Sequence, residues 1–349
     1  MNLKRQHPLN IGLVYETFET YAPRPGAPAD ADVEYEPEST VKVLEAAIER
    51  LGHRPLRVGS PESIWAHGVR SDVTENLDVA LNIAEGRGSR NREAWAPVLL
   101  EMAGVPFLGS DALTLSTTLD KAWANRAVAA AGISVAPQCV LASAEAAEAA
   151  ELPSGFPLFV KPRWEGTAKG IRRTSRVEGR SELAREVERI VADYHQPALV
   201  ESFVPGPEYT VTVVGHQPPR ALPVVQRALD ERSGIGWHAL NEDRGPPWVP
   251  GTLTPDLEAE LAALGLAVFG LFECHDFARA DFKVDAAGRP IFLEINPLPT
   301  FGLEGTFAIL AELEGRPLDA LLAEVIEMGL VRLGLVSVRP TTDGDKGPV

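Results

Sequence analysis

Residues 279–296 read RADFKVDAAGRPIFLEIN, two mostly apolar runs separated by an Asp-Ala-Ala-Gly turn. Alternate residues of a strand point to the same face, so the first run places Arg279 with Asp281 and the second places Glu294 with Asn296. The apolar residues between them bury the opposite face and fix the register. The stretch predicts an antiparallel hairpin, and all four polar side chains reach one cleft if both polar pairs face the same way.

The polar side chains of this hairpin suit a metal-assisted reaction. Two carboxylates and an amide are oxygen ligands of the kind that Mg²⁺ prefers, and water and substrate phosphates often complete its shell. A nearby arginine can neutralise charge on a transferring phosphoryl group or on a tetrahedral oxyanion. The competing interpretation is a solvated polar face on a surface hairpin, and the apolar neighbours of Glu294 argue against it.

Two segments upstream of the hairpin favour a nucleotide site. Lys161 ends an apolar run and precedes the stretch 165–170, whose small residues let backbone N–H groups approach a phosphate. Residues 198–204 form another apolar run, followed by a Pro-Gly-Pro turn and Glu208, which can accept hydrogen bonds from ribose hydroxyls. Each segment alone is weak, because glycine-rich connections are usually turns. The order of the three features along the chain favours the functional interpretation.

Taken together, these residues resemble the ATP-grasp superfamily, and within it the D-alanine–D-alanine ligase-like branch. The resemblance runs from about residue 10 to residue 335, and its most specific part is the pair of motifs Arg279-Ala-Asp281 and Glu294-Ile-Asn296. The supporting matches are Gly104 to Ser110, Asp120-Lys121, Ala131 to Pro137, Lys161-Pro162, Glu201, and Pro205 to Glu208.

The resemblance implies a role for each matched residue. The catalytic residues would be Arg279, Lys161 and Thr167. ATP would be bound by Lys121, Lys161, Glu165, Gly166, Lys169, Gly170, Glu201, Ser202, Phe203, Val204 and Glu208. Two Mg²⁺ ions, with Mn²⁺ as a substitute, would be bound by Asp281, Glu294 and Asn296. The loop 165–170 would close over the phosphates.

Three departures from the family pattern concern the substrates. The loop after Lys161 has Gly-Thr-Ala-Lys where the family has consecutive serines, and Thr167 is the stand-in for a serine that contacts substrate. Pro-Leu-Pro-Thr replaces the family's Pro-Gly-Met-Thr, and Asn-Ile-Ala-Glu-Gly replaces its His-Gly. The candidate substrate residues are therefore Glu34, Glu36, Glu85, Trp237, Pro299 and Thr300. His238 follows Trp237 in a possible lid segment, as a solvated histidine or as a general base.

Alternation of strand-like and helical runs predicts the fold class, α/β and in part α+β. The expected units are an N-terminal parallel α/β substrate domain (1–110), a central ATP-grasp lid subdomain (111–203), a C-terminal catalytic subdomain (204–335) and a disordered tail (336–349). The two ATP-grasp subdomains would clamp ATP. Residues 110–131 read as one helical stretch, and the proline-rich segment 21–37 is either a loop over the site or a surface insertion.

Composition excludes several classes of function. A formal charge of −16 argues against general nucleic-acid binding, which needs a basic face. Cys139 and Cys274 lie far apart and form no Cys-x-x-Cys motif or Cys/His cluster, so neither a disulfide framework nor a zinc site is expected. Apolar runs are too short for a signal peptide or a membrane span. We expect a cytoplasmic protein with small-molecule partners, which the resemblance would make a homodimer.

The function expected from the sequence is ATP-dependent ligation of a carboxylate to an amine through an acyl phosphate. Joining two D-alanines is the leading hypothesis. A ligase of the same fold that joins a different carboxylate and amine, for a specialised metabolite, is the first alternative. A nucleotide-binding regulator without catalysis is the second, and the intact Arg279, Asp281, Glu294 and Asn296 argue against it.

Overall fold

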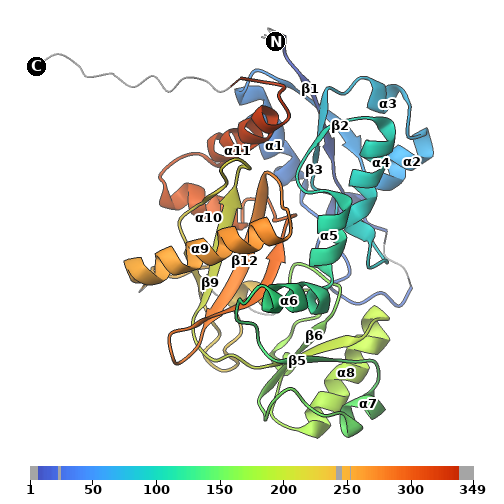
Figure 1. Cartoon of the computed structure of the whole chain (residues 1–349). Coiled ribbons are helices and arrows are strands. Elements are labelled where there is room, and N and C mark those ends of the chain that lie inside the picture. Colours follow the sequence, from blue (N-terminus) through green and yellow to red (C-terminus); the bar gives the residue numbers. More distant parts are fainter. Residues whose placement is uncertain (1–6, 23–24, 241–245, 252, 338–349) are drawn as a thin grey trace, which may run out of the picture.

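The computed structural model describes residues 7–22, 25–240, 246–251 and 253–337. The described strands form three sheets. Helices pack on each sheet, so the described chain divides into three units that adjoin one another (Figure 1). The expected tail lies almost wholly outside the described residues, and the predicted boundaries between the three units stay predictions.

The N-terminal sheet is parallel, in the order β2-β1-β3-β4. Its strands are β1 (Asn10–Val14), β2 (Arg54–Gly59), β3 (Val79–Asn82) and β4 (Phe107–Leu108), and its helices are α1 (Glu38–Arg50), α2 (Pro61–His67), α3 (Asp72–Glu75) and α4 (Trp95–Ala103). The predicted β-α-β pattern is confirmed. The short helices α2 and α3 were not predicted, because they are too brief to show apolar periodicity.

The central sheet is antiparallel, in the order β5-β8-β6-β7. Its strands are β5 (Gln138–Leu141), β6 (Leu158–Pro162), β7 (Arg176–Val177) and β8 (Ala198–Ser202), and its helices are α7 (Ala144–Ala149) and α8 (Arg180–Tyr194). Leu183, Val187 and Ile190 of α8 are buried against Val160 and Val200 of the sheet. This spacing of three and four residues is the apolar stripe expected of an amphipathic helix.

The C-terminal sheet is also antiparallel, in the order β10-β9-β12-β13, with β11 paired to β9. Its strands are β9 (Glu208–Val214), β10 (Arg220–Ala221), β11 (Val225–Arg227), β12 (Phe277–Val284) and β13 (Pro290–Asn296). Helix α9 (Pro255–Leu271) covers one face (Figure 1). Gly265 allows this close packing, because a Cβ there would be 2.6 Å from Val211 Cγ1.

The predicted hairpin is β12–β13, and its register is the favourable one. Arg279 lies opposite Asn296, and Asp281 lies opposite Glu294. Directly opposed residues of an antiparallel pair share a face, so the two polar pairs point to the same side. A register irregularity follows Asp281, after the polar residues have been paired.

The helical stretch expected at 110–131 is confirmed, but it is not continuous. Two helices occupy it, α5 (Ala112–Leu119) and α6 (Lys121–Ala130), separated at Asp120, whose ψ of 90° is not helical. The Asp120 carboxylate caps α6 through Trp123 N–H and accepts from Arg163 Nε at 2.7 Å. A polar cap and a long-range ion pair therefore outweigh the helical propensity of the run. Ala124 and Val128 of α6 pack into the core of the C-terminal sheet.

The last two helices, α10 (Thr306–Leu313) and α11 (Leu318–Arg332), return to the N-terminal unit. Helix α11 lies beside α1 (Figure 1), and both share one buried core with β1 and β3. Arg332 of α11 also pairs with the buried Asp276 at 2.7 Å. Helix α10 was not predicted. Four single-turn 3-10 helices complete the described structure, at Phe18–Thr20, Arg92–Ala94, Arg173–Ser175 and Trp237–Ala239.

Among the described residues, no helix combines the length and the apolar character needed to cross a bilayer.

Three aromatic rings join the C-terminal sheet to the shared core. Phe301 stacks on Phe307 with ring centroids 5.1 Å apart and meets Phe277 edge to face at 5.0 Å. All three side chains are essentially inaccessible to solvent. Offset and edge-to-face rings interact favourably beyond the area that they bury.

Phe307→Ala should lower the free energy of unfolding by about 3–5 kcal/mol, because it opens a cavity in this core. Urea denaturation followed by circular dichroism measures the loss. Leu313→Ala, on the same helix but 45% exposed, is the matched control and should change stability far less. Equal losses of stability in the two variants would show that the aromatic cluster does not stabilise the fold more than an exposed side chain does.

Candidate active site

A cavity of about 730 Å³ opens where the three units meet. Most of the residues singled out from the sequence line it: Glu34, Glu36, Glu85, Lys121, Lys161, Glu165, Thr167, Lys169, Glu201, Ser202, Phe203, Val204, Glu208, Arg279, Asp281, Glu294 and Thr300. Gly166 and Asn296 line a smaller adjoining pocket, which Glu294 shares. Gly170, Trp237 and Pro299 line neither pocket.

One end of the cavity carries the hairpin charges. Arg279 Nη2 lies 3.0 Å from Asp281 Oδ2 and 3.7 Å from Glu294 Oε1. Lys121 Nζ lies 3.6 Å from Glu294 Oε2. The other Asp281 oxygen accepts a 2.7 Å hydrogen bond from the Thr210 hydroxyl. Two cations thus offset two carboxylates where a phosphoryl group could be transferred.

The oxygen atoms of the hairpin side chains fit Mg²⁺ only if a bound ligand supplies further oxygen atoms. Asp281 and Glu294 offer carboxylate oxygens from opposed positions, while Asn296 Oδ1 accepts from Leu298 N–H at 2.9 Å. No group of three or more His, Cys, Asp or Glu able to hold a metal occurs in the described part of the chain. Magnesium does not need such a cage, because phosphate oxygens and water usually complete its coordination.

A buried ion pair lies beside the segment 201–204. Lys161 Nζ lies 2.8 Å from Glu201 Oε2, and both side chains are almost fully buried. Burial lowers the pKa of Lys161, but Glu201 and Glu294 outweigh it, so the net pKa is raised and the ammonium stays charged. Asn125 Nδ2 donates to the other Glu201 oxygen at 3.0 Å. A fixed cation therefore stands on the cavity wall.

Glu208 lies in a group of three titratable side chains. Lys283 Nζ is 3.7 Å from its Oε2, and His238 Nε2 is 3.2 Å from its Oε1. Burial lowers the pKa of His238 well below its usual range, and Arg227 and Arg279 act in the same direction. The imidazole is therefore neutral at neutral pH. A general base of such low pKa gains little driving force for proton transfer.

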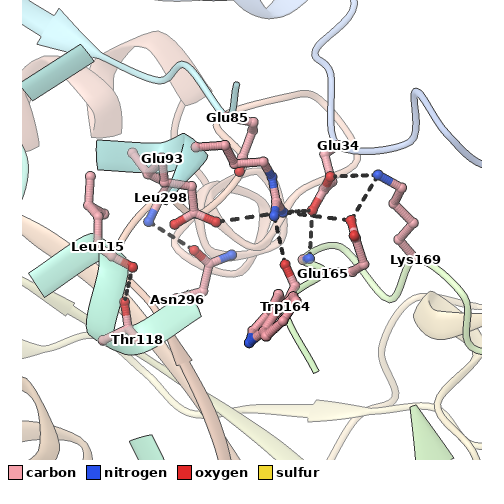
Figure 2. A network of polar contacts seen from close by, with 12 residues as sticks. Glu34, Glu85, Glu93, Leu115, Thr118, Trp164, Glu165, Lys169, Asn296 and Leu298 are labelled. Carbon is pink, nitrogen blue, oxygen red and sulfur yellow. Dashed lines mark hydrogen bonds and ion pairs between the residues drawn. The ribbon is translucent and has the colours of Figure 1, made fainter. Parts of the chain in front are cut away.

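The glycine-rich loop is held by the N-terminal unit, so the segment 21–37 does reach the site. Glu34 accepts hydrogen bonds from Gly166 N–H at 2.6 Å and from Lys169 Nζ at 3.1 Å. Lys169 also lies 2.8 Å from Glu165 Oε2. Figure 2 shows these three carboxylate and ammonium groups in one network. Thr167, with a φ of 45°, lies between these anchors and lines the cavity.

Arg92 is the centre of this network, and the sequence analysis missed it. Its guanidinium lies 2.5 Å from Glu34 Oε1, donates to the carbonyl of Trp164 at 2.6 Å and is 3% exposed. Burial raises the pKa of Glu34, but Arg92 and Lys169 bring it down to about 2. Glu34 is therefore a charged, fully paired carboxylate. Its partner 58 positions away gives no local sequence signal.

Three carboxyls surround this network, of which Glu16 and Glu93 are buried and Glu85 is half-buried. Burial raises the pKa of Glu85 well above its usual range, with Glu93 adding to the effect. Burial likewise raises the pKa of Glu16 and of Glu93 to about 7. Glu16 Oε2 accepts from Glu85 N–H at 2.9 Å, while its Oε1 is buried without a hydrogen-bond partner within the described chain.

The two antiparallel sheets, with the charged cavity where they meet the N-terminal unit, have the arrangement of the ATP-grasp fold. Comparison with known proteins agrees. Residues 127–327, more than half of the chain, match the family model described as D-ala D-ala ligase C-terminus. The chain belongs to the D-alanine–D-alanine ligase family, and it is an ATP-dependent ligase that forms C–N bonds.

Individual relatives extend the match beyond that region. The D-alanine–D-alanine ligase of Halorhodospira halophila is 31% identical over 80% of this chain and 87% of its own length. An uncharacterized protein of Sinorhizobium fredii, y4sG, is 28% identical over 81% of this chain and 85% of its own. The ATP complex of Bacillus anthracis D-alanine–D-alanine ligase, at 19% identity, shares the fold with a TM-score of 0.67 over 95% of this chain and all of that chain.

Glu16→Gln should flatten part of the pH dependence of stability. Below the unfolded-state pKa this carboxyl is protonated in both states and leaves the free energy of unfolding unchanged. As pH rises from about 4.5 to about 7, the unfolded chain loses the proton before the folded chain does, so the fold is progressively destabilised. At 1.4 kcal/mol per pKa unit the full effect is about 3 kcal/mol. Urea unfolding at pH 5, 6, 7 and 8 measures it. Glu101→Gln, at an exposed position of α4, should keep the original slope, and an unchanged slope in Glu16→Gln would refute the assignment.

Proposed function

We propose that this ligase uses ATP to activate the carboxylate of one amino acid and joins it to the amine of another. The observation that carries the proposal is the convergence of Lys121, Lys161, Arg279, Asp281 and Glu294 on one cavity. ATP use follows from the family. The particular residues, the metal and the substrates are the proposed part.

The nucleotide would lie along the central and C-terminal sheets. Lys121 and Lys161 would offset phosphate charge, with the loop 165–170 over the phosphates. The segment 201–204 would meet the adenine edge through its backbone groups, and Glu208 would accept from the ribose hydroxyls. Glu208 is well placed for this task, because Lys283 and His238 hold its carboxylate at the cavity wall.

Asp281, Glu294 and Asn296 would hold Mg²⁺, with Mn²⁺ as a substitute. When bound between carboxylates and phosphates, such an ion neutralises charge and orients the phosphoryl group for in-line transfer. Asp281 and Glu294 supply a rigid frame for it, since both belong to paired strands.

The reaction has two steps. An oxygen of the substrate carboxylate attacks the γ-phosphorus of ATP, the bond to the β,γ-bridging oxygen breaks, and an acyl phosphate and ADP result. The amine then attacks the acyl carbon, and phosphate leaves as the amide forms and the nitrogen loses a proton. Arg279, positioned by Asp281, would stabilise the charge on the tetrahedral oxyanion.

The contact between Glu34 and the loop 165–170 suits the protection of this intermediate. An acyl phosphate that met water would hydrolyse, and ATP would be consumed without product. The hydrogen bonds from Gly166 N–H and Lys169 to Glu34 would hold the loop over the cavity. Its opening would admit nucleotide and release product.

D-Alanine in both substrate positions is the leading proposal, because several relatives are named D-alanine–D-alanine ligases. A different carboxylate and amine is the alternative that the departures from the family pattern favour. Glu34, an expected anchor for a substrate ammonium, already has Arg92 and Lys169 as partners. Glu36, Glu85 and Thr300 stay candidates for substrate contacts at the cavity wall. The expected cytoplasmic location and homodimer also stay predictions.

Purified protein with Mg·ATP should release ADP when given the correct pair from a panel of D- and L-amino acids. Mass spectrometry identifies the product, and D-alanyl-D-alanine would establish the leading substrates. Asp281→Asn should slow release at least about 100-fold, because it weakens metal binding at the transferring phosphoryl group. Asp256→Asn, an exposed Asp of α9, is the control. Full activity in Asp281→Asn would rule out the proposed site.

Lys169→Met should loosen the loop and uncouple the reaction. The ratio of ADP to amide product is expected to rise severalfold, because water would reach the acyl phosphate. Both products are measured in the same mixture, with Lys42→Met at an exposed position of α1 as the control. A ratio that stays at one would show that Lys169 does not protect the intermediate.

A further inference from the structure

Asp30 is a half-buried carboxylate of the N-terminal unit whose side chain bonds across to the central unit. Its Oδ2 accepts from Gly170 N–H at 2.8 Å. The Tyr194 hydroxyl donates to the same carboxylate and lies 2.8 Å from Oδ1 and 3.0 Å from Oδ2. Gly170 ends the loop 165–170, and Tyr194 ends helix α8. One carboxylate therefore ties a loop and a helix of the central unit to the N-terminal unit.

Residues 28–37, which we call the strap, carry Asp30 and are fixed to the N-terminal unit. Tyr35 of the strap is buried, and its N–H donates to the carbonyl of Asp32 at 2.8 Å, which closes a turn. The carbonyl of Glu36 accepts from Phe18 N–H at 3.2 Å. The backbone of the strap is thus held by its own turn and by the segment after β1, so Asp30 is presented to the central unit from a fixed base.

The strap contacts both ends of the loop 165–170. Glu34 accepts from Gly166 N–H at one end, and Asp30 accepts from Gly170 N–H at the other. The two carboxylates have the same spacing in the strap as the two glycines have in the loop. A loop held at one end can still turn about that end, whereas a loop held at both ends cannot. The Asp30 contact therefore completes what the Glu34 contact begins.

The backbone of this loop is strained, so its conformation depends on contacts from outside. Thr167 has a φ of 45° and Ala168 a φ of 56°, in the left-handed region that is unfavourable for residues with a Cβ. Such conformations persist where the surrounding contacts over-determine them. Gly170 has a φ of 80°, and a Cβ there would be 2.5 Å from Pro162 Cγ. We expect the loop to leave this conformation when the strap no longer holds it.

Tyr194 extends the contact from the loop to the central unit as a whole. Burial raises the pKa of its phenol, and the hydrogen bond to Asp30 acts in the same direction, so the hydroxyl stays protonated and donates. The Arg189 guanidinium lies 6.0 Å from the centroid of the Tyr194 ring, and its Nη2 donates to the carbonyl of Gly170 at 2.7 Å. These side chains therefore hold Gly170 at both its N–H and its carbonyl group. Movement of the central unit away from the strap would break the Asp30 contacts to the loop and to α8 together.

We propose that Asp30 is a positioning residue of the ligase: with Tyr194 it fixes the far end of the loop 165–170 and keeps the central unit closed over the bound nucleotide. The proposal rests on the proposed position of this loop over the ATP phosphates. Asp30 is not among the residues that line the cavity, so it acts through the loop. Nucleotide can leave only when such a loop opens, and water is excluded while it is closed. Asp30 therefore strengthens nucleotide binding and protects the acyl phosphate.

Binding of Mg·ADP tests this role without any amino-acid substrate. Isothermal titration calorimetry on the full-length protein should show that Asp30→Ala raises the Kd about 10-fold, the range expected when hydrogen bonds to a charged group are lost. Asp30→Asn keeps an oxygen acceptor for Gly170 N–H and should recover most of the affinity. Asp32→Ala is the matched control, because the Asp32 side chain lies in the same strap and forms no hydrogen bond or ion pair with another described residue.

Two further measurements separate positioning from a general effect on the fold. Tyr194→Phe should raise the Kd by a smaller factor, and adding it to Asp30→Ala should change nothing more, because the two changes remove the same hydrogen bond. With the amino-acid pair that supports turnover, Asp30→Ala should release severalfold more ADP than amide, while the KM for each amino acid changes less than about twofold.

The outcomes that would overturn the proposal are distinct from failure of the ligase proposal. If the unaltered protein does not bind Mg·ADP, the proposed nucleotide site fails, and this proposal fails with it. If Mg·ADP binds and Asp30→Ala changes neither its Kd nor the ratio of ADP to amide, Asp30 does not hold the loop. A lower unfolding temperature in Asp30→Ala with both values unchanged would show a purely structural role. Tyr194→Phe answers the question if Asp30→Ala does not fold.

Discussion

Pairing between β12 and β13 in a single register is the constraint on which the site depends. Because Arg279 opposes Asn296 and Asp281 opposes Glu294, four polar groups share one face, and Phe282 and Phe292 bury the other. A slip of one residue would reverse every side chain and place carboxylates in the apolar core. A shifted register would therefore be much less stable than the observed one, and this difference in stability specifies the pairing of β12 with β13.

Charge compensation explains much of the remaining architecture. The chain has an excess of 16 negative charges, yet its cavity holds lysines and arginines from the central and C-terminal units. Each is retained where a carboxylate or a nucleotide phosphate can offset it, as Glu201 offsets Lys161. An acidic protein can bind a polyanion in this way, because the relevant charges are local and shielded from the surface.

Local sequence patterns predicted the hairpin and the strand that contains Lys161, because alternation, turn chemistry and spacing are visible within about twenty residues. The family resemblance added further site residues, and most of the residues predicted in these two ways line the cavity. The break at Asp120 and the pairing of Arg92 with Glu34 were not predicted, because each depends on partners that only the folded chain brings near. Helix α10 was not predicted for a different reason, because its eight residues are mostly apolar and show no clear periodicity.

The packing of α11 against α1 has a consequence for how the chain is made. The core of the N-terminal unit contains Leu9 and Ile11 as well as Val325 and Leu330, so its apolar surface cannot be covered until nearly the whole chain is available. During synthesis the first sheet would leave the ribosome well before its last helix, with that surface exposed. The central sheet, whose core residues fall between 139 and 200, has no such dependence. The unit that is translated first would therefore be among the last to reach its final packing.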